Sequence, residues 1–194
     1  DVELWLGWLH AWHYTPTYDD ARALNRLDRA ERLFRAENNP AGRCWALLGQ
    51  ALTYFTLDEY PLMQRALKAV RTLQTHQQDE QAACWLLDLT ILHDRFSGRY
   101  TNALAQATAL ANRAAQSGDR FAQGRALAYR AALEVDLGRP PEAIAETAAA
   151  AVSTLRRATA QPGYALLAAY RAGIQARLRG GDTAEAARLL AVAD

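Results

Sequence analysis

The chain has 194 residues and a formal net charge of +1 at pH 7, and hydrophobic residues make up 51% of it. This length and composition are ordinary for a folded globular chain, which excludes intrinsic disorder. Alanine and leucine, with 42 and 28 copies, far outnumber valine and isoleucine, with 8 together. Because strong helix formers are in excess and β-branched strand formers are scarce, we exclude a sheet protein and expect an all-α fold.

Helix and turn signals alternate along the whole chain. Gly, Pro and Asn end helices and Asp or Ser begins the next one, as at Asn38-Asn39-Pro40 and at Gly180-Gly181-Asp182. In chain order the expected helices cover residues 2–14, 18–36, 41–56, 59–76, 81–96, 100–116, 120–136, 140–158, 163–179 and 182–194. The sequence therefore predicts five helical hairpins and no strand.

The same residue types recur every 40 positions. Trp5, Trp45 and Trp85 share one column at this period, and a second column is occupied by leucine from residue 47 to residue 167. A sustained period of 20 to 50 residues indicates a repeat array, in which each hairpin buries its apolar faces against its neighbours. We therefore expect a single repeat domain over 1–194, with units at 1–39, 40–79, 80–119, 120–160 and 161–194.

Two motifs resemble a known family. They are Trp45-Ala46-Leu47-Leu48-Gly49 with Leu52, and Leu137-Gly138-Arg139-Pro140-Pro141-Glu142-Ala143-Ile144. The first is similar to the first-helix pattern of tetratricopeptide-like repeats, and the second to the start of their second helix. The long unit resembles the helical regions of bacterial MalT/LuxR-type regulators and of repeat-bearing signalling proteins. The resemblance implies an α-solenoid of about five antiparallel hairpins wound into a right-handed superhelix.

One column of the first helices stays largely polar at the 40-residue period. Its members are His10, Gln50, Thr90, Arg130 and Tyr170. Residues three, four or seven positions away share that face of a helix. These neighbours include His13, Tyr14, Arg43, Tyr54, His93, Asp94, Gln123 and Glu134. The resemblance places these positions in a concave groove, which we expect to bind an extended peptide or a partner's helix. The alternative is a solvated face with pairs such as Arg130 and Glu134.

We expect no metal, no cofactor and no catalytic residues. His10 and His13 are spaced to share a metal, but the only carboxylates near them are Glu3, seven residues before His10, and acids of the loops, and no cysteine is on their face. Phosphate-binding loops and the common hydrolase and metalloprotease motifs are missing from the sequence. The carboxylate pairs Asp19-Asp20 and Asp58-Glu59 stand at expected second-helix starts, where capping explains them.

The tryptophans and cysteines are interpreted as packing residues. The spacings between the tryptophans, three, four and forty residues, are those of core columns. Cys44 and Cys84 would lie in neighbouring helices about 8 to 10 Å apart, whereas a disulfide needs Cα atoms within about 7 Å. We expect reduced thiols, as in a cytoplasmic protein.

Basic and acidic residues are almost balanced, at 22 and 21, and no Lys/Arg run is longer than Arg156-Arg157. Nucleic-acid binding usually needs a basic stripe, and a membrane span needs about 20 apolar residues. We therefore expect neither partner. The chain begins at Asp1 without Met and stops at Asp194 inside a helical pattern, so we expect a fragment of a longer protein.

The function expected from these features is that of a non-catalytic regulatory module. It would bind a protein or peptide, or other domains of the same chain, within a bacterial signalling or transcription regulator. The alternatives are a stand-alone adaptor that binds partner peptides in its groove and, less in keeping with the motifs, an enzyme. A homodimer through the open ends of the repeat array is a further possibility.

Overall fold

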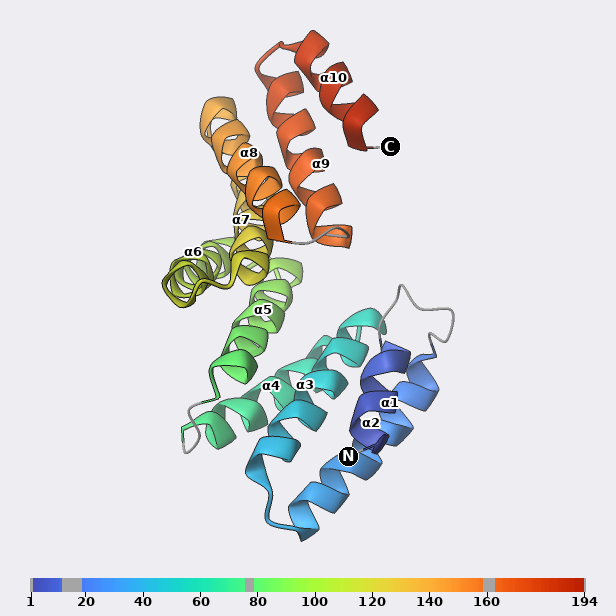
Figure 1. Cartoon of the computed structure of the whole chain (residues 1–194). Helices are drawn as coiled ribbons and strands as arrows, with labels where there is room; N and C mark the ends of the chain where they lie inside the picture. Colours follow the sequence, from blue (N-terminus) through green and yellow to red (C-terminus); the bar gives the residue numbers. More distant parts are fainter. Residues whose placement is uncertain (1, 12–18, 76–78, 159–162, 194) are drawn as a thin grey trace. The chain divides into compact units, whose positions relative to one another are not determined.

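A computed structural model describes residues 2–11, 19–75, 79–158 and 163–193, with the side chains of residues 5, 8–11, 163, 164 and 193 left out (Figure 1). These residues form ten α-helices and no strand, which confirms the all-α prediction for this part of the chain. The helices are α1 (Val2–Ala11), α2 (Asp20–Ala36), α3 (Pro40–Thr56), α4 (Tyr60–Gln74), α5 (Glu80–Phe96), α6 (Tyr100–Ser117), α7 (Arg120–Asp136), α8 (Pro141–Ala158), α9 (Gly163–Arg179) and α10 (Thr183–Ala193).

Short polar side chains begin half of these helices. In each case a carboxylate or amide oxygen accepts a hydrogen bond of 2.9 to 3.1 Å from the backbone N–H three residues later, which satisfies a donor that has no partner within the helix. The capping residues are Asp19, Asn39, Asp79, Asp119 and Asp182. The capping expected of Asp58-Glu59 is wrong. Asp58 has a left-handed φ of 57°, and the Glu59 side chain makes no capping bond.

Five helix pairs are joined by the same turn. Counted from the residue whose carbonyl accepts, the fifth residue has a left-handed backbone conformation and the N–H of the sixth residue donates the hydrogen bond, which is the pattern of a Schellman motif. These bonds are Asn39 to Phe34 at 2.8 Å, Glu59 to Tyr54 at 2.9 Å, Arg99 to Asp94 at 2.7 Å, Arg139 to Glu134 at 2.9 Å and Asp182 to Arg177 at 2.8 Å. The recurrence of one turn at the end of α2, α3, α5, α7 and α9 supports a repeat-like organisation.

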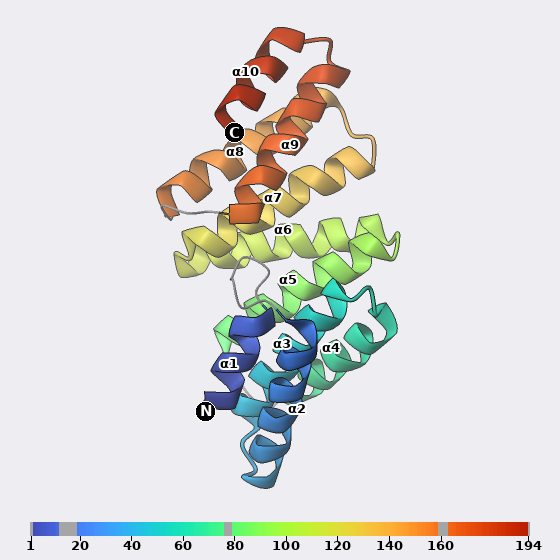
Figure 2. The same ribbon diagram turned by 90° about the vertical axis from the view of Figure 1, so that its right-hand side faces the viewer.

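The chain forms two compact units, residues 1–93 and 94–194, and the boundary falls within α5. In the first unit α1, α2, α3 and α4 pack consecutively, and α1 also contacts α3. In the second unit α6 to α10 pack consecutively, and α7 also contacts α9 (Figures 1 and 2). A helix such as α7 is therefore covered on several sides, which explains its wide apolar surface. No helix in the described ranges is both long and apolar enough to cross a bilayer.

Small residues allow helices of the second unit to approach closely. The alanines of α8 contribute to this packing: Ala148 and Ala151 are buried against residues of α7 and α9. Gly124 on α7 faces Leu155 on α8 so closely that a Cβ at residue 124 would lie 2.6 Å from the leucine Cγ. Alanine and glycine at these positions are therefore part of the core.

The 40-residue register shifts by one residue within the second unit. The helix caps Asn39, Asp79 and Asp119 keep the period of 40. Buried residues of α8 and α9 instead follow those of α6 and α7 at a spacing of 41, as Tyr170 follows Tyr129. The same offset relates Ala103 to Ile144, Ala107 to Ala148, Leu110 to Ala151 and Ala114 to Leu155. Tyr170 therefore matches a core residue, and not Arg130 of the polar column.

We predict opposite effects for two glycine-to-alanine substitutions. Gly124→Ala places a Cβ 2.6 Å from Leu155 Cγ and 3.1 Å from its backbone N, so overpacking of about 1–3 kcal/mol lowers the free energy of unfolding. Gly173→Ala meets only Ala148 Cβ at 3.5 Å and Leu189 Cδ1 at 3.6 Å, so the helix propensity of alanine stabilises this variant by about 0.5–1 kcal/mol. Thermal unfolding of both variants beside the unaltered chain measures this. Equal shifts of Tm would contradict the packing.

Candidate functional site

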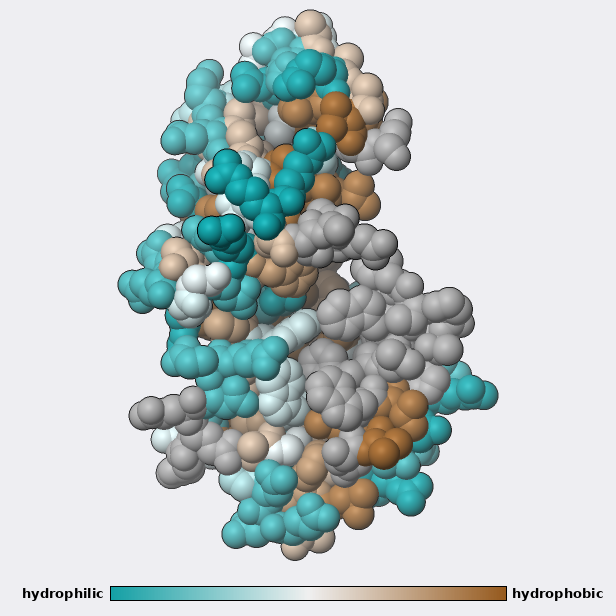
Figure 3. Space-filling view, viewed as in Figure 1, coloured by the Kyte–Doolittle hydropathy of each residue, from teal (hydrophilic) through white to brown (hydrophobic). Residues whose placement is uncertain are grey.

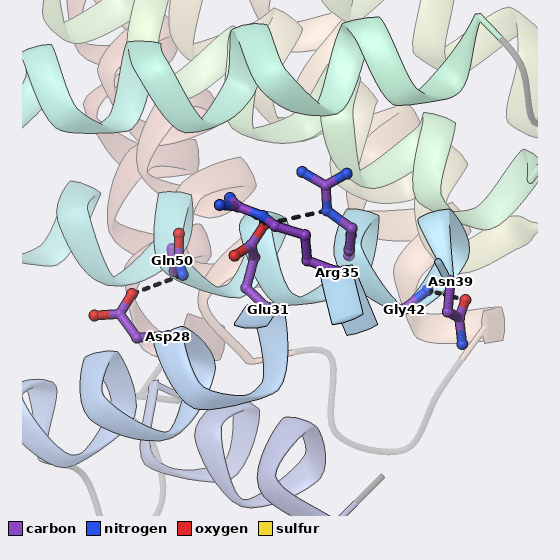
Figure 4. Close-up of polar contacts among 7 residues, drawn as sticks. Asp28, Glu31, Arg35, Asn39, Gly42 and Gln50 are labelled. Atoms are coloured by element: carbon purple, nitrogen blue, oxygen red, sulfur yellow. Dashed lines mark hydrogen bonds and ion pairs between the residues drawn. The ribbon is translucent and has the colours of Figure 1, made fainter. Parts of the chain in front are cut away.

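Gln50 of the predicted polar column and its predicted neighbour Arg43, both on α3, bind side chains of α2 (Figure 4). Gln50 Nε2 donates to Asp28 Oδ1 at 2.8 Å, and Arg43 Nε donates to Glu31 Oε1 at 3.1 Å. Arg35 also donates to Glu31 Oε1, at 2.8 Å. Gln50 and Glu31 are 7% and 6% exposed. These side chains therefore join one helix to the next, and little of Gln50 is left for a partner.

Burial between α2 and α3 raises the pKa values of Tyr54 and Asp28. Burial raises the pKa of the Tyr54 hydroxyl, and the nearby Asp28 carboxylate raises it further. Desolvation also raises the pKa of Asp28, although the Arg32 guanidinium opposes the change. The Tyr54 hydroxyl thus keeps its proton at neutral pH and carries no charge.

On α5 the polar column is represented by Thr90, which is buried. Thr90 Oγ1 donates to the Leu86 carbonyl at 2.6 Å and accepts a hydrogen bond of 3.2 Å from Arg71 Nη2 on α4. His93 is also buried. In the first unit, then, the described column residues make contacts between consecutive helices.

Asp94 is the first carboxylate of the second unit, and both of its oxygens have partners. Oδ1 accepts hydrogen bonds from Arg99 Nε at 3.0 Å and Nη2 at 2.7 Å. Oδ2 accepts one from Gln106 Nε2 at 2.8 Å. The carboxylate is 6% exposed and connects α5 to the following turn and to α6.

Glu134 on α7 differs from Asp94. Its Oε1 accepts a hydrogen bond of 2.8 Å from Arg130 Nε, so the expected pair of these residues is present. Its Oε2 is buried and has no hydrogen-bond partner among the residues that the structure describes. Beside it lies a cavity of about 370 Å³, which we call the Glu134 cleft. It is lined by Leu104, Thr108, Arg130, Glu134, Arg139, Pro140 and Ala143.

A larger hollow of about 510 Å³ lies over α9, between α8 and α10, and we call it the arginine groove. Its lining is small and apolar, with arginines on all three helices. The small and apolar residues are Ala145, Ala148, Ala149, Val152, Ala169, Gly173, Leu189 and Val192. The polar ones are Ser153, Arg156, Arg157, Tyr170, Arg177, Glu185 and Arg188. Four guanidinium groups against one carboxylate give the groove a positive charge.

Two of these arginines have carboxylate partners and two do not. Arg188 forms two hydrogen bonds of 2.6 Å with Glu185, which lower the pKa of the carboxyl and raise that of the guanidinium. Arg177 lies 3.8 Å from Asp182. Arg156 and Arg157 form no ion pair with any described residue. They are therefore the groups most available to an anionic ligand.

Tyr170 is the one predicted site residue in this groove. It is 4% exposed, and its hydroxyl is buried without a hydrogen-bond partner in the described part of the chain. The Arg156 guanidinium carbon stands 5.6 Å from the centroid of its ring, within cation–π range. The tyrosine thus contributes to the site through its ring and an unused hydroxyl.

The structure does not gather all predicted site residues in one place. They are distributed over both units, Arg43, Tyr54 and Gln123 are half-buried, and most of the others are buried. His13 and Tyr14, and the side chain of His10, lie outside the described residues. Sequence reasoning missed the arginine groove because its charges are spread from residue 156 to residue 188, and only the pair Arg156-Arg157 stood out.

The cysteines and tryptophans offer no second centre of chemistry. Cys44 is buried, Cys84 is half-buried, and both are free thiols. The half-buried Trp45 donates from Nε1 to Asp79 Oδ2 at 3.1 Å. Within the described ranges no three His, Cys, Asp or Glu side chains are grouped so that they could hold a metal ion. On the face seen in Figure 3, hydrophobic and hydrophilic side chains alternate over α9 and α10.

Comparison with known proteins adds no relative: no family model, curated protein or solved structure matches the chain. The site is therefore interpreted from its own geometry.

We predict that Asp94→Asn destabilises the fold more than Asp136→Asn. The new amide nitrogen would face the Gln106 Nε2 donor, and the charge that holds Arg99 would be lost, at a cost of about 1.5–3 kcal/mol. Asp136 is a partly exposed partner of Arg95 at 2.7 Å, and its substitution costs less than about 1 kcal/mol. Urea unfolding at pH 7 compares the two. A larger loss for Asp136→Asn would contradict the structural role of Asp94.

Proposed function

We propose that this chain is a non-catalytic binding module made of repeated helical hairpins, similar to a tetratricopeptide-like α-solenoid of about five units. Consecutive packing of the helices and the turn shared by five helix pairs support this architecture. The contacts of α1 with α3 and of α7 with α9 are those expected where first helices of successive hairpins meet.

The proposed ligand is an acidic peptide segment held in the arginine groove. The observation that carries this proposal is the pair of guanidinium groups without carboxylate partners, Arg156 and Arg157, beside an apolar floor. Carboxylates of the peptide would pair with the guanidinium groups, and its apolar side chains would cover Val152, Leu189 and Val192. Surface of this kind favours a ligand that is both acidic and apolar.

The size of the groove sets the length of the segment. From Ala145 to Arg157 its α8 wall contains 13 residues, which extend over about 18 Å at a rise of about 1.5 Å from one residue to the next. An extended peptide covers this distance with about six residues. This is a short linear segment, and not a whole domain.

The biological setting proposed for the module is regulation. Its acidic partner would belong to another protein or to another domain of the same chain, within a bacterial cytoplasmic signalling or transcription regulator. A stand-alone adaptor would use the same groove, and the two roles differ in what the bound segment is attached to. No residue is proposed to have a catalytic role.

We predict that charge reversal in the groove weakens binding of an acidic peptide. The probe is a fluorescein-labelled peptide of about eight residues in which glutamates are interspersed with leucines, and fluorescence anisotropy follows its binding. Arg156→Glu combined with Arg157→Glu weakens binding at least about tenfold, because attraction becomes repulsion. Binding to the unaltered chain also weakens as the salt concentration rises.

The matched control is Arg120→Glu combined with Arg171→Glu. Both are exposed arginines of the same unit outside the groove, so the net charge changes equally. This control retains most of the affinity. Equal losses in the two double variants would mean that only overall charge matters, and the groove assignment would be rejected.

A further inference from the structure

Asp94 and Glu134 are equivalent residues in successive helix pairs. They are 40 residues apart, and each lies two residues before the end of its helix, α5 or α7. The backbone carbonyl of each accepts a hydrogen bond from the N–H of an arginine five residues later, Arg99 or Arg139. Both carboxylates are buried. The molecule thus contains two versions of one site, and the complete version indicates what the other lacks.

At Asp94 the arginine and a carboxamide complete the site. Arg99 holds Oδ1, and the Gln106 carboxamide donates to Oδ2 at 2.8 Å. The one-residue register shift places Thr147 of α8 where α6 has Gln106. The Thr147 hydroxyl donates to the Ala143 carbonyl, within the same helix, at 3.1 Å. The Glu134 cleft therefore lacks the amide donor, and Glu134 Oε2 is the atom left without one.

We propose that the Glu134 cleft binds a side-chain carboxamide, from a Gln or Asn of a partner peptide. The amide NH₂ donates to Glu134 Oε2, as Gln106 does to Asp94. The amide oxygen accepts from the Arg139 guanidinium, which lines the cleft and has no side-chain partner in the described part of the chain. The proposal does not depend on the arginine groove, because the two sites share no residue.

The hydrogen-bonding groups of the cleft match a carboxamide well. Glu134 Oε2 is a free acceptor. Thr108 Oγ1 uses its hydrogen in a 2.9 Å bond to the Leu104 carbonyl, so its oxygen can accept the second amide hydrogen. Arg139 supplies the donor. Two acceptors and one donor are the complement of a primary amide.

Charge excludes the nearest alternatives. The Glu134 charge is already balanced by Arg130, and Arg139 adds a positive charge, so an ammonium ligand would meet a net positive site. A carboxylate ligand would place its oxygens against Glu134 Oε2. A neutral amide avoids both penalties. It also donates to a buried acceptor, which costs free energy when it has no hydrogen bond.

The test uses N-acetyl-L-glutamine methylamide as probe and the glutamate analogue, its near-isostere, as control. Side-chain Nε–H signals of Arg130 and Arg139 are followed by NMR during titration. We expect saturable shifts with the glutamine probe and binding of the glutamate analogue at least about tenfold weaker, the difference that one hydrogen bond to a charged group supports. Equal affinity for the two probes, or no binding of either, would overturn the proposal.

Two variants separate ligand binding from an internal contact. Arg139→Ala removes an exposed turn side chain, so we expect weaker binding of the glutamine probe with no change in Tm. Arg120→Ala, an exposed arginine outside the cleft, leaves probe binding unchanged. If Arg139→Ala instead lowers Tm and the probe does not bind the unaltered chain, Arg139 itself closes on Glu134 in solution and the proposal is wrong.

Discussion

A helix covered on several sides leaves little water for its polar side chains, and this constraint organises the molecule. The first helices carry Gln50, Thr90, Asp94 and Glu134 at buried positions. Each must find hydrogen bonds within the protein, because an unsatisfied buried polar group costs about 1–3 kcal/mol. The neighbouring helices or the following turns supply most of these partners. Polar contacts therefore fix which helices are neighbours and how each turn closes, in addition to the packing of alanine and leucine.

The sequence predicted the helices well because their signals are local. Turn residues, helix caps and the 40-residue period gave helix limits close to those of the structure, and Asp19 and Asp119 cap where expected. The surroundings of the polar column could not be predicted in the same way. Periodicity places a residue on one face of a helix, but which neighbour covers that face depends on tertiary packing. Gln50 was expected in an open groove, and its amide binds Asp28 on α2.

The two candidate sites arise where the repeat departs from its own pattern. In the arginine groove, charges from three helices meet over a floor of small residues, a combination that no sequence column contains. In the Glu134 cleft the carboxamide of Gln106 has no counterpart, because Thr147 stands at the equivalent position of α8 and donates to its own helix. The groove would recognise charge, and the cleft would recognise a neutral hydrogen-bonding group. A partner that used both would be selected by two independent chemistries within one compact unit.

The extra residue between α7 and α8 also matters for anyone who wishes to build new proteins from this repeat. A consensus averaged at a fixed interval of 40 would mix core and surface positions of α8 and α9, as it mixes Tyr170 with Arg130. Alignment by the shared turns does not avoid this error, because the turns that end α5 and α7 are themselves 40 residues apart and those that end α7 and α9 are 43 apart. Alignment by the buried residues, at a spacing of 41, does avoid it. The core positions, and not the turns, therefore define the pieces of chain that could be exchanged for one another.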